Sequence, residues 1–234
     1  MTFMTFIRSL LFSIYFFTLT LFMGLFAFYI RYFAKKRALA YAQLWTELSI
    51  KGLTKICKIE IDIKGKEFLP NDSSFIIASQ HQSAFDTLIW MNLLPRPAYI
   101  MKKELIHLPL VGPMLLLSGM IPLDRQGGAR ALKKLVMNCK NAIKDQRQII
   151  IFPEGTRSQY GKKVKLQAGV AAIASQLDLK IVPVSTNSGL HWGRHSFIKK
   201  PGTIYINLHP VITDLSNRKK VLFAIEKSWN NNIM

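Results

Sequence analysis

A run of about 22 uncharged, mostly apolar residues, from 9 to 30, constrains this chain more than any other feature of its sequence. As an α-helix rising about 1.5 Å per residue, the run is about 33 Å long, which is enough to cross a bilayer. It is longer than the apolar part of a cleaved secretory signal, and no small-residue cleavage pattern precedes the next charges. The sequence therefore predicts a retained membrane anchor in residues 1–50 and one globular domain in residues 51–234.

The charges around this run predict its orientation. Arg8 is the only charged residue before it, whereas four basic residues follow it between 31 and 37. The positive-inside rule then places the globular domain on the cytoplasmic face of the cell inner membrane. An alternative to a spanning helix is a helical hairpin that lies in one leaflet, with Gly24 as the bend and residues 38–53 as a second, amphipathic helix.

The globular domain carries almost all of the net charge of +19, because Arg8 is the only charged residue among the first 30. Such an excess of positive charge attracts nucleic acid, anionic membrane lipids or phosphorylated substrates. The aromatic residues concentrate in the apolar N-terminus instead of alternating with basic residues, which argues against nucleic acid. Cys57 and Cys139 have neither disulfide-framework nor zinc-ligand spacing, so we expect no metal and a reducing compartment.

After Lys51 the pattern changes to short apolar runs separated by turns and helical stretches, which is typical of an α/β domain. The nearly continuous apolar runs 149–152 and 181–185 favour strands buried on both faces. The predicted fold is a mixed, largely buried β-sheet flanked by helices and preceded by the N-terminal hydrophobic helix or hairpin. Strands are predicted at 59–64, 74–79, 98–101, 121–124, 148–152, 181–185 and 203–208, and helices at 85–93, 128–144 and 169–176.

One candidate for chemistry follows the second predicted strand, in the segment QHQSAFD. His81 and Asp86 are five residues apart where the strand passes into a helix. If the loop folds the carboxylate onto the ring, Asp86 fixes the imidazole tautomer and His81 becomes a general base. The alternative is that His81 lines a turn and Asp86 only stabilises a helix N-terminus.

Two further segments, GMIPLDR (119–125) and FPEGTR (152–157), each place an arginine just after a strand. The planar guanidinium groups of Arg125 and Arg157 suit bidentate binding of phosphate. Gly155 lets the backbone approach a ligand, Thr156 offers a hydroxyl and an N–H, and Glu154 either binds a substrate hydroxyl or holds Arg157. The alternatives are a surface salt bridge between Arg125 and its neighbour Asp124 and an ordinary polar turn.

Taken in order, HQSAFD, GMIPLDR, FPEGTR and IVPVS resemble the four motifs of the glycerolipid acyltransferases, in particular the 1-acylglycerol-3-phosphate acyltransferases. The segment 102–114 is similar to the stretch between the first two motifs of that family, and the resemblance covers residues 60–210. Gln80 replaces an asparagine often found there, Pro122 and Leu123 replace Phe-Ile, and residues 167–169 depart from the usual Lys-Gly pair. These departures leave the identity of the acyl acceptor undetermined.

The resemblance implies transfer of a fatty acyl group from acyl-CoA or acyl carrier protein to the sn-2 hydroxyl of 1-acyl-sn-glycerol 3-phosphate (lysophosphatidic acid). The product is phosphatidic acid, an intermediate of phospholipid biosynthesis, and the thioester is a co-substrate, so no bound cofactor is expected. The implied catalytic residues are His81 and Asp86. The residues expected to bind the substrate phosphate are Arg125, Glu154, Gly155, Thr156 and Arg157.

Other functions remain open at this point. Within the same family, the acceptor can be another lysophospholipid or an acylated amino lipid. A non-enzymatic binder of anionic lipid fits the charge but does not explain the motifs. A serine or cysteine hydrolase fits the His–Asp pair, although the G-x-S-x-G motif is missing from the sequence. The remaining histidines, His107, His191, His195 and His209, are expected to be structural or exposed.

Overall fold

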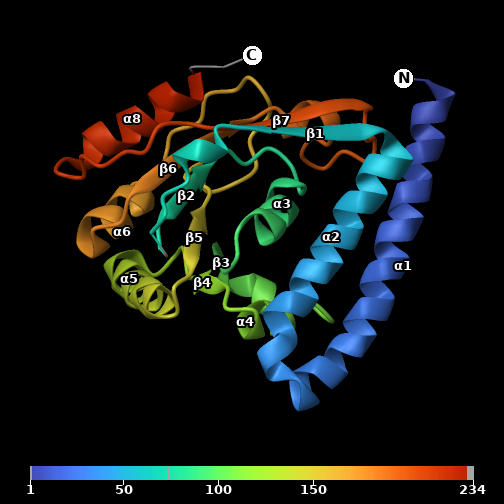
Figure 1. Ribbon diagram of the computed structural model, residues 1–234, viewed down its shortest axis with the longest axis horizontal. Helices are drawn as coiled ribbons and strands as arrows, with labels where there is room; N and C mark the ends of the chain where they lie inside the picture. Colours follow the sequence, from blue (N-terminus) through green and yellow to red (C-terminus); the bar gives the residue numbers. More distant parts are fainter. Residues whose placement is uncertain (1, 73, 231–234) are drawn as a thin grey trace.

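In the computed structural model, which describes residues 2–72 and 74–230, a seven-stranded β-sheet lies between two layers of helices (Figure 1). The predicted mixed α/β fold is confirmed, and every predicted strand is present to within two residues at either end. The strands are β1 (Ile59–Lys64), β2 (Ile76–Ser79), β3 (Pro97–Lys102), β4 (Ile121–Leu123), β5 (Gln148–Ile151), β6 (Ile181–Thr186) and β7 (Gly202–Leu208).

The order of the strands in the sheet is β1-β7-β6-β2-β5-β3-β4. All neighbouring pairs are parallel except β6 and β7, which run antiparallel, so the sheet is mixed. Every residue of β2, β5 and β6 is buried. The continuous apolar runs 76–78, 149–151 and 181–184 within these strands follow from this position, because strands covered on both faces have no side that faces solvent.

The three predicted helices of the body are present with small shifts of their ends. The short helices between the strands and a C-terminal helix were not predicted. The α-helices are α1 (Phe3–Phe33), α2 (Ala38–Cys57), α3 (Asp86–Leu93), α4 (Gly112–Leu117), α5 (Gly128–Lys144), α6 (Gly169–Leu177), α7 (Ser188–His191) and α8 (Arg218–Asn230), and the 3₁₀ helices are η1 (Lys35–Arg37), η2 (Lys66–Phe68) and η3 (Lys103–His107).

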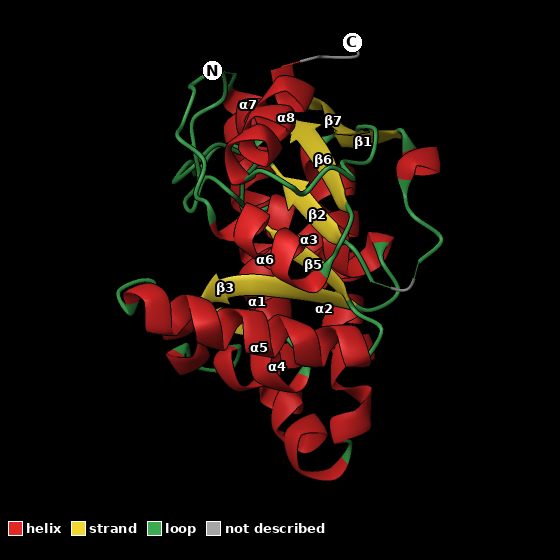
Figure 2. Ribbon diagram, turned by 90° about the vertical axis from the view of Figure 1, so that its left-hand side faces the viewer, coloured by secondary structure: helices red, strands yellow, loops and turns green. Residues whose placement is uncertain are grey.

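The helices α1 and α2 form an antiparallel hairpin along one side of the body (Figure 1), which is the side turned away from the viewer in Figure 2. The predicted bend at Gly24 is wrong, since α1 continues through that residue to Phe33 and the chain reverses at residues 34–37. Gly24 instead allows close packing, because a Cβ atom there would lie 2.7 Å from Cβ of Leu110 in the loop before α4. The predicted second helix is present and continues to Cys57.

The outer face of α1 is apolar along its whole length, with exposed side chains from Phe3 to Phe33. Its most apolar window has a mean hydropathy of 2.1 and is only 17% buried, so α1 is long and apolar enough to cross a membrane. The division of the chain at residues 50 and 51 stays a prediction, because α2 runs across it. Residue 1 and residues 231–234, which the predicted domains include, lie outside the described residues.

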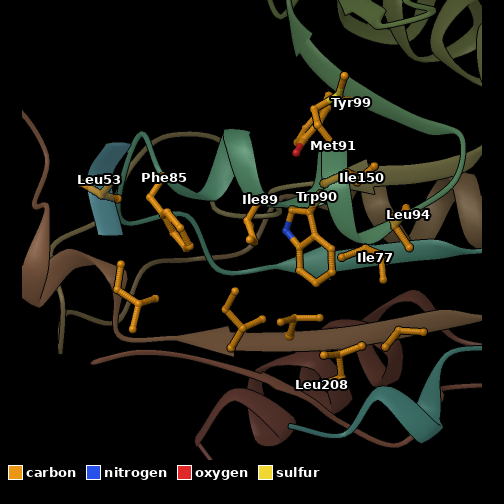
Figure 3. Close-up of a cluster of buried hydrophobic side chains, with 14 of the residues drawn as sticks. Leu53, Ile77, Phe85, Ile89, Trp90, Met91, Leu94, Tyr99, Ile150 and Leu208 are labelled. Carbon is orange, nitrogen blue, oxygen red and sulfur yellow. The ribbon is translucent and has the colours of Figure 1, made fainter. Parts of the chain in front are cut away.

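Two apolar clusters fill the space on either side of the sheet. On one face, Phe85, just before α3, and Ile89 and Trp90 of α3 pack in one buried cluster with side chains of the strands (Figure 3). On the other face, α5, α6 and α8 cover the sheet (Figure 1). The body therefore has a layer of helices on each face, and α3, which begins at Asp86, is held firmly against the sheet.

We expect Gly119→Ala to lower the free energy of unfolding by at least about 2 kcal/mol. Gly119 has a φ of +86°, and a Cβ atom there would lie 2.2 Å from Cζ of Arg147. That guanidinium donates to the carbonyls of Ser118 (2.8 Å) and Pro97 (3.3 Å), so it is not free to move away. Urea denaturation in detergent measures the change. Gly169→Ala is the control, because no atom lies within 4 Å of a Cβ there; an equal loss in both variants would contradict the explanation.

Candidate functional site

The predicted site residues lie at the carboxyl ends of parallel strands. His81 follows β2, Glu154 follows the neighbouring strand β5, and Arg125 follows β4 at the edge of the sheet. In open α/β sheets the loops at this edge form the ligand-binding crevice. The strand order therefore brings together motifs that are separated by about 70 residues in the sequence.

The structure brings Asp86 to the ring of His81. Oδ2 of Asp86 lies 3.4 Å from Nδ1 of His81, and the carboxylate is almost fully buried. The same oxygen accepts hydrogen bonds from the backbone N–H groups of Gln82 (2.7 Å) and Ser83 (2.8 Å). Asp86 thus fixes the start of α3 and also faces the imidazole, so the two interpretations of this residue are compatible. A contact of 3.4 Å is at the long end for a hydrogen bond, as is common in sites without substrate.

Two contacts that the sequence did not indicate fix the position of His81. Its ring stacks on Phe152, with the ring centroids 4.1 Å apart and an angle of 19° between the planes. Its backbone carbonyl accepts a hydrogen bond from the N–H of Ser158 at 2.7 Å. With Nδ1 directed at Asp86, the other ring nitrogen, Nε2, is the one that can meet a substrate.

Glu154 supports the loop that carries His81. One carboxylate oxygen accepts from the backbone N–H of His81 at 2.7 Å, and the other accepts from the hydroxyl of Ser158 at 2.9 Å. The carboxylate is therefore engaged with His81 and Ser158, and we find no contact with Arg157 among the described residues. Burial raises the pKa of Glu154 to about 7, and the charge of Asp86 adds to the effect, while the two hydrogen bonds oppose it.

This raised pKa predicts a pH-dependent difference between the protein and its Glu154→Gln variant. The folded state holds the proton of Glu154 up to a pH of about 7, whereas the unfolded chain releases it near the ordinary pKa of 4.5. Stability therefore falls as pH rises between these values, by about 3 kcal/mol, and the neutral glutamine of the variant cannot contribute to this fall. We expect the variant to gain stability relative to wild type between pH 5 and pH 8 in urea denaturation. A constant difference across that range would contradict the raised pKa.

The turn after β5 has features of an anion site. Gly155 has a φ of +74°, and its carbonyl accepts a hydrogen bond from Nη1 of Arg125. Within the described residues, the backbone N–H groups of Thr156 and Arg157 have no hydrogen-bond acceptor. Successive free N–H groups around a left-handed residue can bind an anion. The suggested salt bridge between Asp124 and Arg125 is wrong, because Asp124 instead lies 3.7 Å from Nζ of Lys103.

The two glutamines beside His81 connect its loop to the end of β6 and to α7. Oε1 of Gln80 accepts from the backbone N–H of Thr186 at 2.9 Å, and Oε1 of Gln82 accepts from that of Gly189 at 3.1 Å. Gln80, which departs from the asparagine of the resembled motif, thus has a structural partner of its own. The loops after β2, β5 and β6 form one connected unit.

The other histidines fit the expectation that they are structural or exposed. His209 is buried, and its Nε2 lies 2.8 Å from the hydroxyl of Ser185, with its pKa lowered by burial. His107 and His195 are exposed. Nδ1 of His191 lies 3.0 Å from the carbonyl of Lys200. Among residues 2–72 and 74–230, no group of three or more His, Cys, Asp or Glu side chains is arranged to hold a metal ion.

The fold and the site define a class of protein, namely an α/β protein that holds a His–Asp pair beside a basic turn at the carboxyl edge of its sheet. Comparisons with known proteins identify the family within this class. The model of the family described as acyltransferase matches residues 60–187, which is more than half of the chain. The chain belongs to this acyltransferase family.

The chain is also similar to proteins named 1-acyl-sn-glycerol-3-phosphate acyltransferase. It is 30% identical to one from Pseudomonas aeruginosa, over 73% of this chain and 66% of that protein, and 32% identical to one from Cocos nucifera, over 71% and 54%. It thus spans about half to two thirds of the length of these relatives. The crystal structure of the 1-acyl-sn-glycerophosphate acyltransferase from Thermotoga maritima shares the fold, with a TM-score of 0.77, 24% identity and coverage of 95% and 93%.

Proposed function

We propose that this protein transfers a fatty acyl group from a thioester donor to the sn-2 hydroxyl of 1-acyl-sn-glycerol 3-phosphate, which yields phosphatidic acid. The observation that carries the proposal is the His81–Asp86 pair, held 3.4 Å apart beside a turn with free N–H groups and arginines. A base and a phosphate site side by side are what the acceptor requires. The names of the relatives support the same reaction.

In this mechanism His81 acts as a general base. Asp86 accepts a hydrogen bond from Nδ1–H of His81, so the lone pair of Nε2 is left to take the proton of the sn-2 hydroxyl. The alkoxide oxygen attacks the thioester carbonyl, the C–S bond breaks, and the imidazolium returns its proton to the leaving thiolate. No acyl-enzyme forms, because the acceptor oxygen itself is the nucleophile. The stack on Phe152 holds the ring, and the hydrogen bonds with Glu154 and Ser158 hold the backbone of His81, for both proton transfers.

The phosphate of the acceptor binds at the turn after β5. The N–H groups of Thr156 and Arg157 are available to it, together with the side chains of Arg125 and Arg157. Holding the phosphate places the hydroxyl at His81, so that binding energy lowers the entropic part of the barrier. Glu154 was expected to share in this binding, but its contacts support a different role, which is to hold the loop of His81.

We further propose that the protein is bound to the cytoplasmic face of the inner membrane through the hairpin of α1 and α2. The hairpin packs along the body, and its turn carries Lys35, Lys36 and Arg37, which suit anionic headgroups. The contacts of α1 with both α2 and α4 favour a hairpin lying in one leaflet over a helix that leaves the body to span the bilayer. A lipid acceptor and a lipid product can then exchange laterally.

The experiment that tests the function is an assay of the purified chain in detergent. Thiol release and radiolabelled phosphatidic acid are measured from 1-acyl-sn-glycerol 3-phosphate, with acyl-CoA and acyl carrier protein as parallel donors. Other lysophospholipids and acylated amino lipids are run as competing acceptors, because the departures at Gln80 and at residues 167–169 concern the acceptor. No product with either donor would refute the proposal, and faster transfer to another acceptor would correct the substrate.

Arg157→Ala is expected to raise the KM for the acceptor by about 10- to 100-fold while kcat changes little, because a charge-assisted contact to phosphate contributes about 1.5–3 kcal/mol. Steady-state kinetics with varied acceptor measure this. Lys140→Ala on α5 is a control that removes an exposed cation outside the proposed site. If the control shifts KM equally, general attraction by the basic surface explains the effect.

A further inference from the structure

A loop between α7 and β7, residues 192–199, lies against the membrane helix α1. The ring of Trp192 meets that of Phe12 edge-on, with centroids 5.5 Å apart, and Phe197 packs on Phe6 at 5.7 Å. These aromatic contacts join two segments that are about 185 residues apart in the sequence. The loop is thus held by the anchor as well as by the body.

The buried side chain of Lys199 strengthens the same contact between the loop and α1. Only 5% of this lysine is exposed, although lysine is rarely buried without a partner. Its ammonium lies over the rings of Trp192 and Phe197, each at 5.2 Å, and of Phe12, at 5.5 Å. It also donates to the carbonyl of Phe197 at 2.8 Å and to the hydroxyl of Ser13 on α1 at 3.2 Å. A desolvated cation in such an aromatic cage is a strong point of attachment.

The other side of the loop reaches the proposed phosphate site. Nη1 of Arg194 donates to the backbone carbonyl of Arg157 at 3.1 Å, and the side chain is otherwise exposed. Arg125 binds the carbonyl of Gly155 in the same turn. No carboxylate of the described residues forms a salt bridge with Arg125, Arg157 or Arg194.

We infer that Arg194 is a further ligand of the acceptor phosphate, and that α1 positions it through the cage of Lys199. The inference rests on the proposed function, which it deepens by naming a residue outside the four motifs. Arginines without carboxylate partners gathered at one turn repel one another, and a phosphate monoester relieves that repulsion. One bond to a carbonyl leaves most of the five guanidinium donors of Arg194 free for the ligand. The loop that carries it cannot leave the site while α1 is docked.

The first test is the acceptor KM of Arg194→Ala. We expect a rise of about tenfold with kcat within about twofold, and partial recovery in Arg194→Lys, which restores the charge but not the fork. Lys200→Ala is the matched control, since Lys200 is exposed directly after the loop and forms no salt bridge within the described part of the chain. An unchanged KM in Arg194→Ala, or an equal rise in Lys200→Ala, would overturn the role of Arg194.

The second test is a double-mutant cycle with Lys199→Met, which keeps the length of the side chain and removes the charge. If α1 positions Arg194, Lys199→Met raises the acceptor KM by about fivefold in the wild-type background and has no further effect in Arg194→Ala. If the two effects multiply, the link through α1 is refuted.

Calorimetric titration of the variants with the acceptor alone, in detergent, measures the affinity for the acceptor in the absence of acyl transfer. This separates the two proposals. A wild-type protein that binds the acceptor but makes no product refutes the proposed function, whereas an active protein whose affinity does not depend on Arg194 refutes only the present inference.

Discussion

Replacement of His81 by glutamine is expected to lower kcat for acyl transfer by about 10²- to 10⁴-fold, which is the usual contribution of a positioned general base. Glutamine retains a polar side chain of similar size but cannot take a proton from the sn-2 hydroxyl. The acceptor KM should change much less, because the proposed phosphate contacts lie at the turn after β5 and not at His81. Thiol release under saturating acyl-CoA measures the effect.

The matched control is His107→Gln, which makes the same substitution at an exposed histidine of η3. It should keep wild-type activity. Full activity in His81→Gln would remove the base from the mechanism, even if the protein remained an acyltransferase. A parallel loss in both variants would point to an effect on folding or on detergent stability, which circular dichroism would detect.

Asp86→Ala is expected to affect both activity and stability. Asp86 is 2% exposed, and its carboxylate accepts two backbone hydrogen bonds, from Gln82 and Ser83. Its removal leaves two buried N–H groups without a partner, at about 1–3 kcal/mol each, so the free energy of unfolding should fall by about 2–6 kcal/mol. The tautomer of His81 is also no longer fixed, and kcat should fall by at least about 100-fold. Urea denaturation and the thiol assay measure the two effects.

Asp86→Asn separates these two contributions. Its amide oxygen can still accept from the backbone, so most of the stability should return, but the amide carries no charge to stabilise the imidazolium. The variant should therefore be well folded and nearly inactive. If Asp86→Asn is as active as wild type, Asp86 serves only to start α3, and the orienting role is excluded.

The sheet was predictable from the sequence because its central strands are buried on both faces and read as continuous apolar runs. The apolar runs at 149–152 and 181–185 coincide with β5 and β6 to within one residue at each end. The helix α8 was missed because only three of its residues, Val221, Ile225 and Trp229, are buried and the rest are mostly polar. The turn of the hairpin was misplaced for a related reason. Glycine favours bends, but at Gly24 the space was needed by Leu110, which no local pattern reveals.

The site was predictable where one motif supplies both partners and not where a contact joins distant segments. The proximity of His81 and Asp86 follows from their spacing at a strand-to-helix passage. The contacts of Glu154 with the backbone of His81, and of Arg194 with that of Arg157, depend on the order of the strands and on the docking of α1. Phe152 stood within a predicted motif, but only the neighbouring position of β2 and β5 shows that its ring meets the imidazole.

The paired loops after β2 and β5 make the geometry of His81 depend on the alignment of two strands. Ile76, Ile77 and Ala78 are opposite Ile149, Ile150 and Ile151, and a few residues later the chains exchange hydrogen bonds in both directions, from His81 to Glu154 and from Ser158 to His81. A slip of this pairing by one residue would move each donor away from its acceptor by about 3.3 Å. A chain with a slipped sheet could remain compact and yet be inactive. The amount of secondary structure is therefore a poor measure of correctly folded protein here, and the fraction of molecules with an active site is a better one.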